Sequence, residues 1–167
     1  GRLANLVEEG IDVALRVGQF EDSSLIERLL MPCGLHACAS PEYLKKYGKP
    51  KHPNELKTHN CLIYSQRPNP DNWLFRDDQG GDISIKVNGN LRSSMGNILM
   101  NAAQNGSGIF IGPTFMIASA VKEGRLETVL DQYTPMTTGL YVIYPRSKLV
   151  SAKVRAFVDF ITESWSN

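Results

Sequence analysis

The hydrophobic pattern along the chain alternates between helical and strand spacing, and glycine residues mark several of the changes. Residues 3–9 place apolar side chains on one helical face, Gly10 ends that helix, and residues 11–17 alternate as a β-strand. Farther along, residues 95–104 hold the apolar spacing of a strong helix, and residues 108–112 form an apolar run typical of a buried strand. Alternating helices and strands predict an α/β fold.

The remaining elements continue this alternation in two α/β lobes. We expect further strands at residues 25–31, 35–39, 61–64, 73–76, 83–87, 89–93, 126–130 and 140–144. We expect further helices at residues 41–47, 115–123 and 152–165, with a short turn at 53–56. The chain crosses between the lobes near residues 38–40 and again near 137–140, so lobe I holds residues 1–38 and 139–167 and lobe II holds residues 39–138.

Local signals refine several of these elements. Ser40 can cap the helix at 41–47, and the proline that follows it suits the first helical position, where no backbone N–H is needed. Residues 32–34 (Pro-Cys-Gly) are expected to separate two strands. The strands at 73–76, 83–87 and 89–93 are expected to form one antiparallel meander, with Asn88-Gly89 as a turn.

Composition and charge exclude few classes and favour a soluble protein. Hydrophobic residues make up 42% of the chain and charged residues 21%, and the net charge is +1, so bulk charge does not direct the chain to nucleic acid. The densest basic run lies between Lys45 and Lys51 and is read as a solvated helix end. No signal peptide and no membrane-spanning apolar run are present, which predicts a cytoplasmic protein without membrane contact.

The cysteines and histidines do not form a metal or catalytic pattern. Cys33, Cys38 and Cys61 have no CxxC spacing and fit reduced thiols, with a redox pair of the first two as the alternative. The three histidines, at positions 36, 52 and 59, lack metal-ligand spacing and are expected to be surface or hydrogen-bonded structural residues. No nucleophile elbow, phosphate-binding loop or zinc-protease motif is present, so we expect no enzyme, no metal and no cofactor.

Three segments have the position of a ligand site in an α/β domain, because each follows a strand or opens a helix. Free N–H groups and the helix dipole at such places favour a carboxylate or another anion. The candidate ligand-binding residues are Val17, Gly18, Gln19, Phe20, Ser93, Ser94, Met95, Asn97, Pro113, Thr114 and Phe115.

Each of these residues also has a structural interpretation. Ser94 and Thr114 could serve only as helix caps, and Gln19 could be an exposed loop residue. Phe20 and Phe115 are expected in the core rather than in a binding site. Outside the candidate set, Arg16 is expected in an ion pair, Asp159 in solvent, and Trp73 and Phe75 in the core of lobe II.

Several phrases, in order and at matching spacing, together resemble the effector domain of LysR-type bacterial regulators. They are residues 3–18 (LANLVEEGIDVALRVG), 39–44 (ASPEYL), 59–62 (HNCL) followed by Trp73 and Phe75, 102–113 (AAQNGSGIFIGP), 124–130, 144–145 and 154–160. Each phrase alone is weakly specific, but the series covers almost the whole chain.

The resemblance implies a two-lobed, periplasmic-binding-protein-like (type 2) fold with two crossover strands and a small-molecule effector between the lobes. It also implies a homodimer or homotetramer that binds DNA through an N-terminal winged helix-turn-helix domain and a linker helix, which this chain lacks. Because the chain opens within a helix and without methionine, we expect a fragment in which the first strand–helix–strand of lobe I is absent.

Two other functions remain as alternatives. A solute-binding protein of a transport system would share this fold, and a two-lobed enzyme would need a catalytic constellation that the sequence does not supply. A helix-turn-helix in the upstream reading frame would select the regulator, and a secretion signal there would select the transport protein.

Overall fold

The chain forms two compact units in a computed structural model, which describes residues 14–17, 24–135, 138–146, 155–156, 159–160 and 163. One unit comprises Gly1–Cys33 and Thr137–Asn167, and the other comprises Gly34–Met136. The assignment of these units to lobes I and II, with the boundaries expected from the sequence, stays a prediction. The predicted helix at residues 3–9 lies outside the described residues.

The first unit contains a three-stranded antiparallel sheet. Its strands are β1 (Ala14–Val17), β11 (Thr138–Pro145) and β2 (Leu25–Cys33), in the order β1-β11-β2. The predicted break at residues 32–34 is wrong for its first two positions, because β2 continues through Pro32, which pairs with Gly139. An edge strand such as β2 tolerates proline. The described residues of the predicted C-terminal helix, 155–156, 159–160 and 163, are helical.

The sequence led to one prediction for Arg16 and one for Asp159, and the structure tests only the second. The Asp159 carboxylate is exposed, as expected, and accepts a hydrogen bond from the Arg28 guanidinium at 3.2 Å. The side chain of Arg16 lies outside the described part of the chain, so its expected ion pair stays a prediction.

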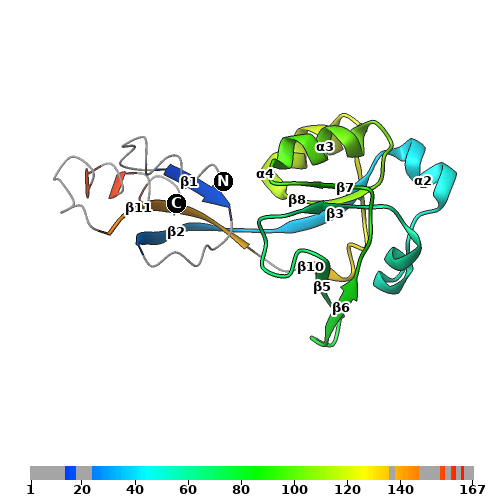
Figure 1. The fold of residues 1–167 in the computed structure, drawn as a ribbon, viewed down its shortest axis with the longest axis horizontal. Helices are drawn as coiled ribbons and strands as arrows, with labels where there is room; N and C mark the ends of the chain where they lie inside the picture. Colours follow the sequence, from blue (N-terminus) through cyan, green and yellow to red (C-terminus); the bar gives the residue numbers. More distant parts are fainter. Residues whose placement is uncertain are drawn as a thin grey trace. The chain divides into compact units, whose positions relative to one another are not determined.

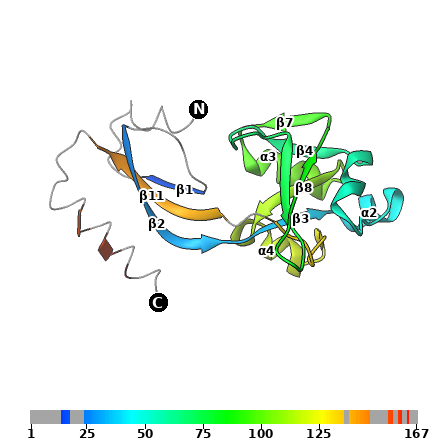
Figure 2. The same cartoon turned by 90° about the horizontal axis from the view of Figure 1, so that it is seen from below.

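A five-stranded sheet forms the centre of the second unit. Its strands are β7 (Leu91–Ser93), β4 (Cys61–Tyr64), β8 (Ile109–Pro113), β3 (Leu35–Ala39) and β9 (Glu127–Val129), in that order across the sheet. Figure 2 labels the first four of them. Strands β7, β4 and β8 are parallel to one another, and β3 is antiparallel to both of its neighbours. Because the three parallel strands run the same way, their carboxyl ends meet at one edge of the sheet.

Helices flank this sheet. Figure 1 shows α3 (Gly96–Gln104) and α4 (Thr114–Lys122) on one side of it. The chain also forms α2 (Pro41–Tyr47) and the 3-10 helix η1 (Pro53–Thr58). The predicted start of α2 is confirmed, because the Ser40 hydroxyl accepts a hydrogen bond from the Tyr43 N–H at 3.1 Å. Lys45, Lys46, Lys49 and Lys51 are exposed, as expected for the end of a solvated helix and the loop after it.

A small antiparallel sheet consists of β10 (Thr134–Pro135), β5 (Asn72–Arg76) and β6 (Asp82–Lys86). The predicted meander is wrong at its third strand, because β7 pairs in parallel with β4 instead. Gly89 explains the difference: a Cβ there would lie 1.7 Å from the Cys61 carbonyl oxygen, so the chain passes in contact with the start of β4. The Cys61 N–H also donates to the Asn88 carbonyl at 3.0 Å.

The five-stranded sheet has an apolar core on each face. Leu62 and Phe110 face α3 and α4, whereas Ile63 and Ile111 pack with Trp73 and Phe75. These two aromatic side chains are 4% and 2% exposed, which confirms their expected place in the core. Alternation along β4 and β8 follows from the two-residue period of a strand that is covered on both sides.

The cysteines lie in the interior. All three are buried, and none of them forms a disulfide. Burial raises the pKa of the Cys38 and Cys61 thiols to about 12, because the charged thiolate is disfavoured away from water. Both are therefore protonated and poorly nucleophilic at neutral pH, which does not favour redox sensing by Cys38.

The Asn60 side chain joins the amino ends of the three parallel strands. Its Nδ2 donates to the Asn90 side-chain oxygen at 2.8 Å and to the Ser107 carbonyl at 2.7 Å, and its Oδ1 accepts from the Asn90 N–H at 2.9 Å. Asn60 precedes β4, Asn90 precedes β7, and Ser107 lies two residues before β8. One amide thus fixes where three strands begin.

Two of the three histidines have the expected structural roles in this region. His52 caps η1, where its Nδ1 accepts from the Asn54 N–H at 3.0 Å. The Tyr43 hydroxyl accepts from the Asn60 N–H at 3.3 Å and shares a 2.7 Å hydrogen bond with His59 Nδ1. Burial lowers the pKa of His59, although the charge of Glu55 opposes that shift.

Acidification is expected to destabilise the unit through His59. Its pKa is lower in the folded chain than in the unfolded one, where it is about 6.5, so the unfolded chain binds the proton first as the pH falls. The stabilising effect of neutral His59 is therefore complete above that unfolded pKa and is lost as the pH falls toward the folded one. Urea unfolding of the native protein and of His59→Gln at about pH 7.5 and about pH 5.5 measures this difference. An equal loss of stability in both proteins would contradict the assignment.

Candidate functional site

The carboxyl edge of the five-stranded sheet has the topology of a ligand site. From β4 the chain goes to β7 on one side, and from β7 it returns through α3 to β8 on the other side of β4. The gap between the carboxyl ends of β4 and β8 is thus a topological switch point, where open α/β sheets bind ligands. The beginning of β3 lies at the same edge, because Leu35 pairs with Pro113.

Seven of the predicted site residues lie along this edge. Ser93 ends β7 and Pro113 ends β8; Ser94, Met95, Asn97, Thr114 and Phe115 lie where α3 and α4 begin. A Cβ at Gly96 would lie 3.1 Å from the Met116 Cε atom, so the starts of the two helices lie close together. Val17 ends β1 in the other unit, and Gly18, Gln19 and Phe20 lie outside the described residues.

Three of the structural interpretations are wrong. Neither α3 nor α4 has a side-chain hydrogen bond at its N-cap, so Ser94 and Thr114 are not helix caps. Instead, the Ser93 hydroxyl accepts from the Met95 N–H at 3.0 Å. Phe115 is 57% exposed rather than buried, because the second position of α4 projects beyond the core that Ile117 and Ala120 form.

Thr114 links the start of α4 to the start of β3. Its hydroxyl donates to the Gly34 carbonyl at 3.3 Å and lies 2.8 Å from His36 Nε2. Because the hydroxyl hydrogen is used, the threonine oxygen accepts from Nε2–H, which orients the imidazole. This contact is the hydrogen-bonded role that was expected for His36, and it puts an imidazole at the carboxyl edge.

Arg67 is a further charged residue of this edge. It is half-buried, its Nη2 donates to the Ile111 carbonyl at 3.4 Å, and its guanidinium carbon lies 6.0 Å from the centroid of the Tyr64 ring. Burial lowers the pKa of the Arg67 guanidinium, because removal from water disfavours the charged form. Arginine nevertheless stays protonated at neutral pH, so the edge carries a partly desolvated positive charge.

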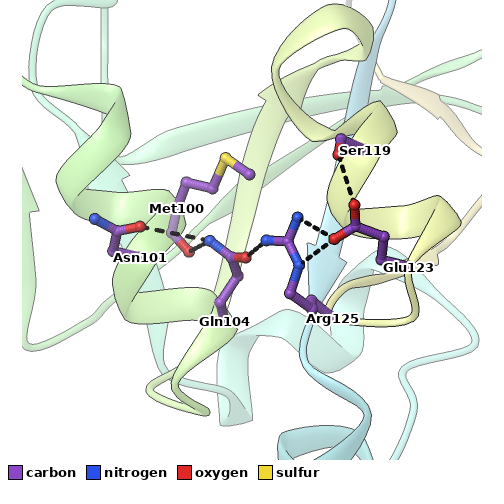
Figure 3. A network of polar contacts seen from close by, with 6 residues as sticks. All are labelled: Met100, Asn101, Gln104, Ser119, Glu123 and Arg125. Carbon is purple, nitrogen blue, oxygen red and sulfur yellow. Dashed lines mark hydrogen bonds and ion pairs between the residues drawn. The ribbon is translucent and has the colours of Figure 1, made fainter.

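A polar network connects the far ends of α3 and α4 (Figure 3). The Arg125 guanidinium donates to the Gln104 side-chain oxygen and makes two 2.8 Å contacts with Glu123 Oε2. Ser119 also donates to the Glu123 carboxylate, at 3.3 Å. These contacts hold the two helices together at their carboxyl ends, while their amino ends face the candidate site.

Comparison with known proteins identifies the family of this chain. The family model described as the LysR substrate binding domain matches residues 1–166. The chain belongs to the LysR substrate-binding domain family.

The relatives of this LysR-type domain are transcriptional regulators. It is 34% identical to the HTH-type transcriptional regulator CrgA of Neisseria meningitidis over 164 residues, which is 98% of this chain and 54% of the relative. It is 33% identical to the HTH-type transcriptional regulator DmlR of Escherichia coli, covering 97% of this chain and 52% of the relative. The LysR-type domain thus spans about half the length of these curated relatives, and membership of the family does not favour a transport protein.

Solved structures of regulators confirm the fold class. The regulatory domain of CrgA from Neisseria meningitidis is 33% identical and matches with a TM-score of 0.77, covering 96% of this chain and 78% of that one. Full-length AphB, a Vibrio cholerae virulence activator, is 29% identical and has a TM-score of 0.75, covering 94% and 53%. The LysR-type domain therefore has the periplasmic-binding-protein-like (type 2) fold. In the part of the chain that the structure describes, no helix is long and apolar enough to cross a membrane.

Proposed function

We propose that this chain is the effector-binding regulatory domain of a LysR-type transcriptional regulator, and that a small molecule binds at the carboxyl edge of its five-stranded sheet. The observation that carries the proposal is the convergence of Ser93, Ser94, Thr114 and Phe115 beside the β4–β8 switch point. Val17, Gly18, Gln19 and Phe20 remain proposed contributors from the first unit. Family membership supports the function of a regulator, and the residues at the carboxyl edge of the sheet favour ligand binding over catalysis.

The response of the full-length protein follows from linkage. An effector that binds one arrangement of the two units more tightly shifts the population toward it, and a DNA-binding domain attached to the chain then changes position. We propose that the full-length protein contacts DNA through an N-terminal winged helix-turn-helix domain, acts as a homodimer or homotetramer, and works in the bacterial cytoplasm. The HTH-type relatives support the DNA-binding part of this proposal, because they are transcriptional regulators.

A tryptophan at position 94 tests the proposed site. Ser94 is exposed, so Ser94→Trp should fill the edge without disturbing the core. Small carboxylates, aromatics and amino acids are screened against the full-length protein by thermal shift, because a ligand of the native state raises the melting temperature. We expect at least one compound to raise it, and Ser94→Trp to abolish that rise.

The control is Ser84→Trp, which places the same bulk at an exposed position on β6. This variant should keep the full thermal shift and the ligand-dependent change in affinity for promoter DNA. A shift that persists in Ser94→Trp would remove the site from this edge, and a native protein that responds to no compound would count against effector binding.

A further inference from the structure

The Arg67 guanidinium retains hydrogen-bonding capacity at the carboxyl edge. An arginine side chain has five N–H donors. Among the residues that the structure describes, one of these donors has a hydrogen-bond partner, the Ile111 carbonyl, and the other contact of the guanidinium is with the Tyr64 ring. No described carboxylate pairs with it, whereas Arg92 pairs with Asp71 and Arg76 pairs with Asp82. A half-buried cation that lacks a counter-charge favours the binding of an anion.

The hydrogen bond to Ile111 places this cation at the switch point. The parallel pairing of β4 with β8 ends at Leu62 and Phe110, so the Ile111 carbonyl lies one residue beyond the last paired position. Arg67 donates a hydrogen bond to this carbonyl at a position where β4 is no longer paired with β8. Its guanidinium is therefore at the carboxyl ends of β4 and β8, between the two strands that define the switch point.

The surrounding backbone adds positive potential. The first turns of α3 and α4 contain no acidic residue, and the structure gives neither helix a side-chain cap. The helix dipoles at these two ends act in the same direction as the guanidinium, while the Thr114 N–H itself donates to the Gly34 carbonyl. Exposed Met95 and Phe115, which begin the same helices, add apolar surface to this edge.

We propose that Arg67 binds the carboxylate of the effector, and that the effector is a small organic carboxylate whose apolar part packs against Met95 and Phe115. This inference rests on the proposed function, and it adds the chemical class of the ligand and the residue that selects it. A planar guanidinium matches a carboxylate with two parallel hydrogen bonds, which an uncharged amide of the same shape cannot reproduce.

Isothermal titration of the full-length protein tests the inference with three carboxylates, phenylacetate, 4-methylpentanoate and hexanoate, and with their amides. We expect the native protein to bind at least one carboxylate at millimolar concentration and to bind its amide at least about tenfold more weakly. Arg67→Met should weaken carboxylate binding at least about tenfold, and Arg67→Lys, which keeps the charge but not the planar fork, should weaken it less. Arg76→Met, at an exposed arginine on β5, should bind as the native protein does.

Thermal unfolding of the free variants separates a binding defect from a folding defect, and the Arg67→Lys variant keeps the test valid if Arg67→Met does not fold. Native binding of none of the carboxylates, equal binding of a carboxylate and its amide, or unchanged binding by Arg67→Met would each overturn the inference. If a neutral compound binds and Ser94→Trp abolishes its binding, the inference fails while the proposed function stands. If Ser94→Trp leaves every response unchanged, the proposed site itself fails.

Discussion

Replacement of Phe75 by alanine is expected to lower the free energy of unfolding of the second unit by about 3–5 kcal/mol. The Phe75 side chain is 2% exposed and packs in the core between the five-stranded sheet and the β5–β6 hairpin. Its removal loses buried apolar area and leaves a cavity that the surrounding strands fill only in part. Urea unfolding measures the change, with the fluorescence of buried Trp73 as reporter. An unchanged m-value would show that the variant exposes the same surface on unfolding as the native protein.

Leu74→Ala is the matched control, because Leu74 precedes Phe75 on the same strand and points away from the core. It is 37% exposed, so its replacement should cost less than about 1 kcal/mol. Equal losses from the two variants would mean that the strand does not have the alternating burial described above.

The second large effect is expected for Gly89→Ala, which should lower the free energy of unfolding by about 3 kcal/mol, the upper end of the usual cost of overpacking. The new Cβ would lie 1.7 Å from the Cys61 carbonyl oxygen, and backbone atoms cannot yield as a side chain does. Strand β7 would separate from β4, and Ser93 and Ser94 would move with it. We therefore expect thermal unfolding at a lower temperature and loss of effector binding together.

Gly96→Ala provides the control, because it makes the same chemical change at a position with a flexible neighbour. A Cβ there would lie 3.1 Å from the Met116 Cε atom, the free end of a long side chain. The change should be within about 1 kcal/mol of the native protein, since alanine also favours a helix start. A Gly89→Ala variant as stable as Gly96→Ala would show that the chain does not pass over β4 so closely.

Periodicity predicted most of the second unit because the strands of its five-stranded sheet are covered on both faces and because α2 begins at a local capping signal. The helix at Ser40-Pro41 and the core positions of Trp73 and Phe75 depend on neighbours in sequence or on burial, which the pattern reveals. Strand β7 was misassigned because its partner is set by a close backbone approach at Gly89, and no residue pattern reports which chain passes beside a glycine.

The candidate site could be predicted only where it coincides with the ends of elements. Ser93 and Thr114 were found in this way, since strand ends and helix starts are visible in the sequence. Arg67 was missed because it lies in a proline-rich loop after β4, and its burial depends on the distant Ile111. A single arginine just after a buried parallel strand was the one available signal, and it indicates nothing until the strand order is known.

The hydrogen bonds of Asn60 make the two ends of the parallel strands differ in how freely their residues can be substituted. The starts of β4, β7 and β8 are held by one amide, so substitutions at their opposite ends do not have to preserve the alignment of the strands. Exposed positions such as 94, 95, 97 and 115 can then be randomised with little cost to folding. A biosensor library built on this domain would keep Asn60 constant and vary only these exposed positions to obtain new ligand specificities.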